Sequence, residues 1–152
     1  MGFTAAGIAT DTVTTTQQAP LGFILTVPDG DNGLQEWIYV YNDSGSEVPT
    51  AKVATRKAAT ANYHIAAAGA INPAQAVGLC VTPIPNGSYG FLLRKGIGTA
   101  TSAGTVNANE GLILAASGNV AHQGAATGSA CGNTLAGRTG GGTLTVFISC
   151  AG

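Results

Sequence analysis

The segment from Glu36 to Asn42 constrains the fold of this chain more than any other. Successive side chains of a strand point to opposite faces, and aromatic and aliphatic residues alternate here. The aromatic face carries Trp37, Tyr39 and Tyr41, and the aliphatic face carries Ile38 and Val40. Because both faces are apolar, we expect a strand covered on both sides, as in a closed barrel or at a subunit interface.

Other short runs of apolar and β-branched residues predict further strands, separated by turns rich in glycine, proline, asparagine and aspartate. They are Leu21–Val27, Tyr63–Ile65, Val77–Thr82, Leu112–Leu114 and Thr143–Ser149. The sequence has no amphipathic helical pattern and no repeat of fixed period. It therefore predicts an all-β fold in which residues 21–152 form a single compact β-barrel or β-sandwich domain.

Residues 1–20 are rich in threonine, alanine and glutamine, and we expect them to form an extended N-terminal arm. Part of this arm is β-prone but lacks large apolar anchors. It consists of Asp11, Thr12, Val13, Thr14, Thr15 and Thr16. Such a run can add a strand to the sheet edge of a partner. A frayed terminus is the alternative interpretation.

A tight hairpin turn at Asn86-Gly87 is predicted to join two strands in the middle of the chain. The second strand places Tyr89 and Phe91 on one face, and Gly96 beyond them indicates a bulge or corner. The aromatic residues expected in the core or at a subunit interface are Trp37, Tyr39, Tyr41, Tyr89 and Phe91. A sugar-stacking platform is the alternative role for the aromatic strand.

Two segments fit more than one structure. Residues 50–58 are compatible with a short helix or with an edge strand guarded by lysine and arginine, and we favour the edge strand. Residues 115–142 consist mostly of small residues and are too long for an ordinary connection. They either hold short strands or pack against a neighbouring molecule.

Charged residues make up only 9% of the 152-residue chain, and the net charge is −1. Nucleic acids and anionic membranes require a basic surface, so we expect neither as a partner. Neutral polar side chains, or burial against other subunits, must then keep the chain soluble, which favours a component of an assembly. The start of the chain lacks a basic residue and a long apolar core, so we expect cytoplasmic synthesis.

The three cysteines cannot all pair within one chain, and we favour buried free thiols over a Cys131–Cys150 bridge that leaves Cys80 alone.

The sequence does not match the common motifs for catalysis. Thr101 replaces the third glycine of a dinucleotide fingerprint, and no phosphate loop or nucleophile elbow occurs. His64 and His122 lie far apart in the sequence. We therefore predict no catalytic residue, no metal, no cofactor and no enzymatic activity.

Three elements follow one another in a pattern that resembles a known family. The strand Trp37–Val40 is followed by Ala76–Leu79, and then by the Pro-x-Gly-x-Tyr-Gly element Pro85–Gly90, which leads to Lys95-Gly96. This order resembles the decoration, cement or head-stabilising proteins of tailed-phage capsids. The resemblance covers residues 21–114, and the small-residue segment 115–142 departs from it.

The resemblance implies a virion structural protein that binds the outer surface of a phage capsid and stabilises or decorates it. The implied partner is the major capsid protein, the implied state is a trimer, and the implied location is the capsid exterior. The arm residues 11–16 are then the candidate capsid contact, and removal of residues 2–18 is expected to abolish binding while leaving the core folded. The alternatives are a virion fibre or adhesin module that binds host-surface glycans, and a small hydrolase whose triad assembles only in the fold.

Overall fold

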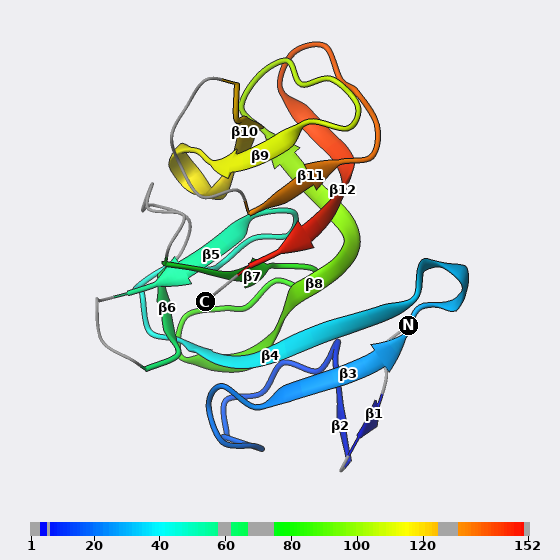
Figure 1. Cartoon of the computed structure of the whole chain (residues 1–152). Helices are drawn as coiled ribbons and strands as arrows, with labels where there is room; N and C mark the ends of the chain where they lie inside the picture. The colour runs from blue at the N-terminus through cyan, green and yellow to red at the C-terminus, as the bar shows by residue number, and fades with distance from the viewer. Residues whose placement is uncertain (1–3, 6, 58–61, 67–74, 125–130, 151–152) are drawn as a thin grey trace.

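The computed structural model describes residues 4–5, 7–57, 62–66, 75–124 and 131–150, and it confirms the all-β fold (Figure 1). The strands are β1 Thr4–Ala5, β2 Ile8–Ala9, β3 Ile24–Pro28, β4 Leu34–Asn42, β5 Val53–Arg56, β6 His64–Ala66, β7 Ala76–Leu79, β8 Ser88–Ser102, β9 Gly111–Leu114, β10 Val120–His122, β11 Gly132–Thr134 and β12 Gly142–Ser149. Two short 3-10 turns, Gly30–Asn32 and Ala116–Gly118, complete the described elements. Within these residues there is no helix of the length and apolarity needed to cross a membrane.

The long strand β8 belongs to two rings of strand pairings. In the first ring the order β4–β8–β7–β5–β6 returns to β4, and in the second the order β8–β12–β11–β9–β10 returns to β8. Strand β3 pairs with the first part of β4, on the edge that pairs with β6 farther along, and among the described residues β1 and β2 pair with each other. Figure 1 shows the second ring above the first, with β1, β2 and β3 below.

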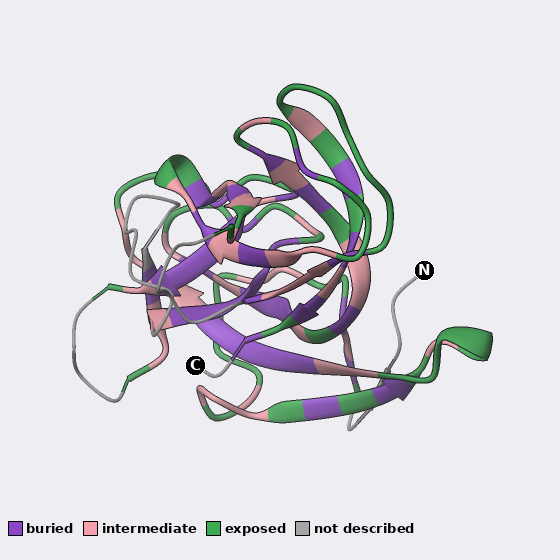
Figure 2. Ribbon diagram, turned by 45° about the horizontal axis from the view of Figure 1, so that its top comes forward, coloured by how far each residue is buried: buried purple, intermediate pink, exposed green. Residues whose placement is uncertain are grey.

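The interior of the first ring is an aliphatic cluster to which all five of its strands contribute. Its strand residues are Ile38, Val40, Ala54, Ile65, Val77 and Leu92. The opposite face of β4 places Trp37 and Tyr39 in a second, larger cluster that continues into the other ring. The predicted alternation along β4 is therefore confirmed, and Figure 2 shows the buried band that it produces.

Strand β8 bends where it changes partners. Its first half pairs with β4 and its second half with β12, and the change occurs at Lys95. One residue of β8, Arg94, has no opposite residue in β4, which is a β-bulge. Gly96 follows with a φ of +136°, a conformation that L side chains rarely adopt. The predicted corner at Gly96 is thus confirmed, and it separates the two rings.

The hairpin predicted around Asn86-Gly87 is confirmed in part, because β7 and β8 pair antiparallel, but this turn does not connect them directly. The turn forms, with a φ of +79° at its glycine. The residue before the turn, Ile84, pairs with Val48 through an isolated bridge and not with β8. Strand β7 pairs with β8 farther along, where Leu79 lies opposite Leu93. The dipeptide predicts a turn correctly, but a local signal does not identify the strand that the turn connects.

The edge strand predicted within residues 50–58 is a strand, but not an edge. Strand β5 pairs with β6 on one side and with β7 on the other. Val53, Ala54 and Thr55 are completely buried, which fits an interior strand. The basic residues at its ends find partners: Lys52 donates to Asn119, and Arg56 lies over the Tyr63 ring at 5.5 Å.

The small-residue segment 115–142 contains β10 and β11, so the alternative of short strands is confirmed for its described part. Residues 125–130 lie outside the described residues.

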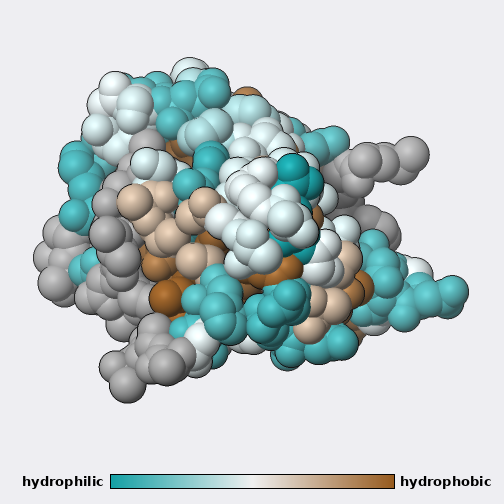
Figure 3. Space-filling model, turned by 90° about the horizontal axis from the view of Figure 1, so that it is seen from above, coloured by the Kyte–Doolittle hydropathy of each residue, from teal (hydrophilic) through white to brown (hydrophobic). Residues whose placement is uncertain are grey.

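The cysteines are buried free thiols, as favoured. Figure 3 shows one face of the molecule, where neutral and hydrophilic residues cover most of the surface and hydrophobic residues are visible mainly near its middle.

Residues 7–20 lie against the domain instead of extending away from it. Ile8 and Thr10 are buried, Val13 packs on the aliphatic cluster, and Ala19 packs on the larger one. Within residues 11–16, Val13 is thus the side chain that contacts a core cluster, and Ile8 adds a buried contact before them.

Candidate functional site

The candidate capsid contact, residues 11–16, forms a layer over the start of β8. Thr14 donates its N–H to the Tyr89 carbonyl at 3.1 Å and accepts from the Tyr89 N–H at 2.7 Å. Its hydroxyl also donates to the Thr16 carbonyl at 2.7 Å. This β-bridge holds the middle of the segment, and Asp11, Thr12, Thr15 and Thr16 are exposed on either side of it.

Gly90 explains why the segment can approach so closely. A side chain at this position would meet Ile84 at 3.0 Å and Val13 at 3.5 Å. The missing side chain leaves room for both residues on the aliphatic cluster. The glycine that ends the Pro-x-Gly-x-Tyr-Gly element thus serves the docking of the N-terminal segment.

A row of aromatic rings lies along the face of β4 and β8 that points away from the aliphatic cluster. Tyr39 lies opposite Phe91, with ring centroids 5.1 Å apart, and Tyr41 lies opposite Tyr89, with centroids 4.5 Å apart. Trp37, Tyr39 and Phe91 are buried, and the buried Tyr39 hydroxyl accepts a hydrogen bond from the Gln18 N–H at 3.0 Å. Tyr41 and Tyr89 are half-buried, so this end of the row reaches the surface. A role of these residues at a subunit interface stays a prediction.

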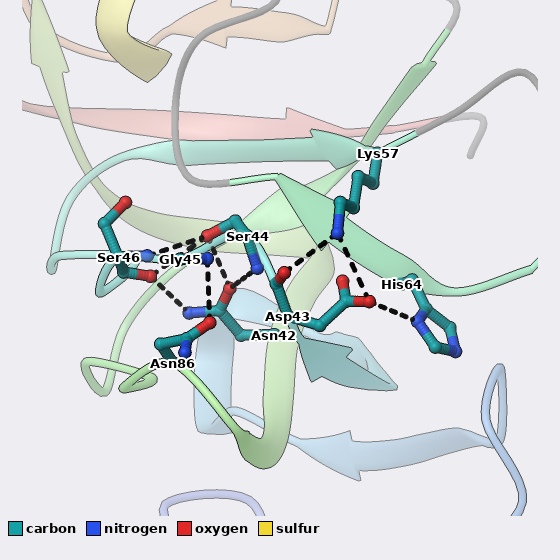
Figure 4. A network of polar contacts seen from close by, with 8 residues as sticks. All are labelled: Asn42, Asp43, Ser44, Gly45, Ser46, Lys57, His64 and Asn86. Atoms are coloured by element: carbon teal, nitrogen blue, oxygen red, sulfur yellow. Dashed lines mark hydrogen bonds and ion pairs between the residues drawn. The ribbon is translucent and has the colours of Figure 1, made fainter.

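The row ends at a charged cluster that the sequence did not indicate. The Asp43 carboxylate lies 3.0 Å from His64 Nδ1 and 3.4 Å from Lys57 Nζ, and Tyr41 contacts the His64 ring edge-on at 5.2 Å (Figure 4). Asp43 follows β4, His64 begins β6 and Lys57 follows β5. One carboxylate therefore connects three strand ends of the first ring. The hydrogen bond from His64, and then the nearby Lys57, lower the pKa of Asp43.

Asn42 organises the loop beside this cluster. Its amide donates to the carbonyls of Ile84 at 2.7 Å and of Ser46 at 2.8 Å, and its side-chain oxygen accepts from Ser44. Asn86 accepts from the Gly45 N–H at 2.8 Å. Figure 4 shows the bonds of Asn42 to Ser44 and Ser46, and the bond from Gly45 to Asn86 that ties the loop after β4 to the turn before β8. The Asn-Asp-Ser-Gly sequence signals a turn here, but the partners across the fold leave no signal in the sequence.

The lowered pKa of Asp43 gives a stability prediction. A carboxyl group whose pKa is lowered in the folded state stabilises the fold at pH values above its unfolded-state pKa. This stabilisation is lost as the pH falls through the lower pKa of the folded state. In Asp43→Asn, the free energy of unfolding is expected to change less between about pH 5 and about pH 2 than in the wild type. Urea unfolding across this range measures it, with Asp31→Asn at an exposed turn as the matched control. Equal pH dependence of the wild type and Asp43→Asn would contradict the role of the cluster.

The serine beside the charged cluster is held by other hydrogen bonds, and the three thiols are buried. The Ser44 hydroxyl bonds to Asn42 and Ser46, whereas His64 faces Asp43. Burial raises the pKa of the thiols to about 12 for Cys80 and Cys150 and to about 11 for Cys131, which keeps them protonated. In the part of the chain that the structure describes, no three ligating side chains gather around a possible metal position. The arrangement is suited to packing and contact, and the absence of enzymatic activity stays a prediction.

Comparison with known proteins adds a structural likeness. No protein-family model matches this chain, and no curated protein gives a significant match. Among solved structures, the chain is similar to the N base of head fiber gp8.5 in bacteriophage phi29. The TM-score is 0.55 at 11% sequence identity, and the match covers 74% of this chain and 92% of that chain. At this identity, the likeness shows that the two chains share a fold.

Proposed function

We propose that this chain is a structural protein of a phage virion that binds the outer surface of the head and stabilises or decorates it. The observation that carries the proposal is the fold shared with the N base of a phage head fiber. The scarcity of charge supports it, because weakly charged surfaces associate through complementary packing and not through long-range attraction. The proposed partner is the major capsid protein, and the proposed state is a trimer.

The physical benefit of such binding follows from mass action. A ligand that binds the mature lattice but not dissociated subunits stabilises the assembled shell. Several weak contacts in one oligomer add through effective concentration. Surfaces rich in small hydroxyl side chains, such as the exposed residues Thr12, Thr15, Thr16 and Ser46, suit contacts of this kind.

Co-sedimentation with decoration-free heads of the phage that encodes this chain tests the proposal. Saturable binding to mature heads at a fixed copy number, with no binding to immature shells, is the expected result. Absence of binding to either form would overturn the capsid-exterior role.

The exposed threonines on either side of the Thr14 bridge are expected to contact the capsid. The double variant Thr12→Lys/Thr15→Lys should weaken head binding about tenfold or more, because it places two desolvated charges in the contact. Co-sedimentation measures the affinity, with Thr143→Lys/Thr145→Lys on exposed positions of β12 as the control. Equal binding by the two double variants would exclude this surface. Substitution is preferable to removal of residues 2–18, which would take Ile8 out of the core.

A head-fibre module that binds host-surface glycans is the second candidate function. The observation that favours it is the likeness to a fibre base in particular. Electron micrographs of reconstituted heads distinguish the two functions, since a decoration protein forms a low coat and a fibre module marks the origin of a projecting fibre. Binding to host cells by the isolated protein is expected only for the fibre module.

A further inference from the structure

A cleft opens beside the bend of β8, next to the start of β4 and the N-terminal segment. It has a volume of about 480 Å³, within the usual range for small-molecule sites. Its apolar lining comes from Trp37, Leu93, Ile97 and Val81, and four threonines also line it. The threonines are Thr10, Thr50, Thr82 and Thr99. The N-terminal segment, β4, β8 and the loop after β7 all contribute, so the cleft exists only in the folded chain.

Gln35 fixes the polar groups on one side of the cleft. Its amide nitrogen donates to the Asp29 carboxylate at 3.1 Å and lies 3.5 Å from the Ile97 carbonyl. Its amide oxygen accepts from the Trp37 indole N–H at 3.0 Å. One side chain therefore orients the carboxylate, the indole ring and the bent part of β8 toward one another. A ligand would meet groups that are already in position, which lowers the entropic cost of binding.

The charge of the lining selects the class of ligand. Asp11 and Asp29 both line the cleft, and none of its described lining residues is basic. Carboxylates accept hydrogen bonds from hydroxyl groups and repel anions. The apolar part, with an aromatic ring among aliphatic side chains, suits a ligand that presents C–H groups on one face. A molecule with many hydroxyls, an apolar face and no negative charge fits all these features.

We propose that this cleft binds a neutral saccharide of one or two sugar rings. The C–H face of the sugar lies on Val81 and Ile97, beside the buried Trp37, and its hydroxyls donate to Asp29 and exchange hydrogen bonds with the threonines. The inference deepens the second candidate function, on which it rests, by giving a head-fibre module its glycan site. Its test uses the isolated protein, so a failure here is distinct from a failure to bind capsids.

Trp37 makes the test direct, because it is the only tryptophan of the chain and lines the cleft. The wild-type protein is titrated with neutral mono- and disaccharides (glucose, galactose, mannose, N-acetylglucosamine and their disaccharides) while its tryptophan fluorescence is recorded. At least one neutral sugar is expected to give a saturable change at millimolar concentrations, and glucuronic acid is expected to give none. No change with any neutral sugar, or an equal response to the acidic sugar, would overturn the proposal.

Matched variants locate the binding. Thr99→Val removes one hydroxyl from the cleft, and Thr145→Val removes the hydroxyl of the residue directly opposite it on β12, outside the cleft. Thr99→Val is expected to weaken sugar binding about tenfold, and Thr145→Val to leave it unchanged. Asp29→Ala should abolish the response, whereas Asp31→Ala, in the same turn, should retain it. Sugar binding that is indifferent to Thr99→Val and Asp29→Ala would place the sugar elsewhere and refute the site.

Discussion

Phe91→Ala is expected to lower the free energy of unfolding by about 3–5 kcal/mol. The Phe91 ring is 1% exposed and packs against Tyr39, at the point where β4 and β8 support the larger core cluster. Truncation would leave a cavity that the rigid pairing of these two strands cannot close. Urea denaturation followed by circular dichroism measures the loss.

Phe147→Ala is the matched control, because Phe147 is only half-buried on β12. Less buried apolar surface is lost there, and solvent can fill the space. Phe147→Ala should therefore lower the free energy of unfolding by less than half as much as Phe91→Ala. Similar costs for the two variants would mean that the aromatic row is not the centre of the core.

Gly132→Ala is the second substitution with a large expected effect, about 3 kcal/mol or more. Gly132 has a φ of +151°, and an added Cβ would lie 2.1 Å from the Phe147 carbonyl oxygen on β12. Backbone atoms cannot move aside as a flexible side chain can, so β11 would have to separate from β12. The second ring should then lose stability, and urea denaturation would show a lower midpoint.

Gly104→Ala controls for the general effect of replacing glycine. No atom lies within 4 Å of the position of its added Cβ. Its stability should therefore match that of the wild type or exceed it slightly, because alanine restricts the unfolded chain. If both variants behave alike, the close approach of β11 and β12 does not contribute to the stability of the fold.

The strands with a strong alternating pattern could be predicted from sequence, because that pattern arises from burial on two faces. The segment Glu36–Asn42 predicted all but the first two residues of β4, and Thr143–Ser149 predicted all but the first residue of β12. Strand partners were harder to predict. Asn86-Gly87 predicts a turn, but the pairing of Ile84 with Val48 depends on tertiary packing. Residues 50–58 predicted the strand β5, but its position between β6 and β7 depends on the closure of the first ring.

The functional surfaces were less accessible to prediction because their residues come from distant segments. Val13 docks only where Gly90 leaves room for it, and the sequence separation hides this contact. The Asp43 cluster joins the ends of three strands, so each residue alone looks like an ordinary polar surface residue. The cleft likewise needs the bend of β8, and Gln35 has no sequence signature as its organising residue.

A cryo-electron microscopy reconstruction of mature heads incubated with this protein would test the central claim most directly. The proposed function predicts added density on the outer surface at a regular lattice position, into which the two-ring fold fits with residues 11–16 toward the shell. Heads without added density, or density confined to the interior or the tail, would contradict a role as a structural protein of the capsid exterior.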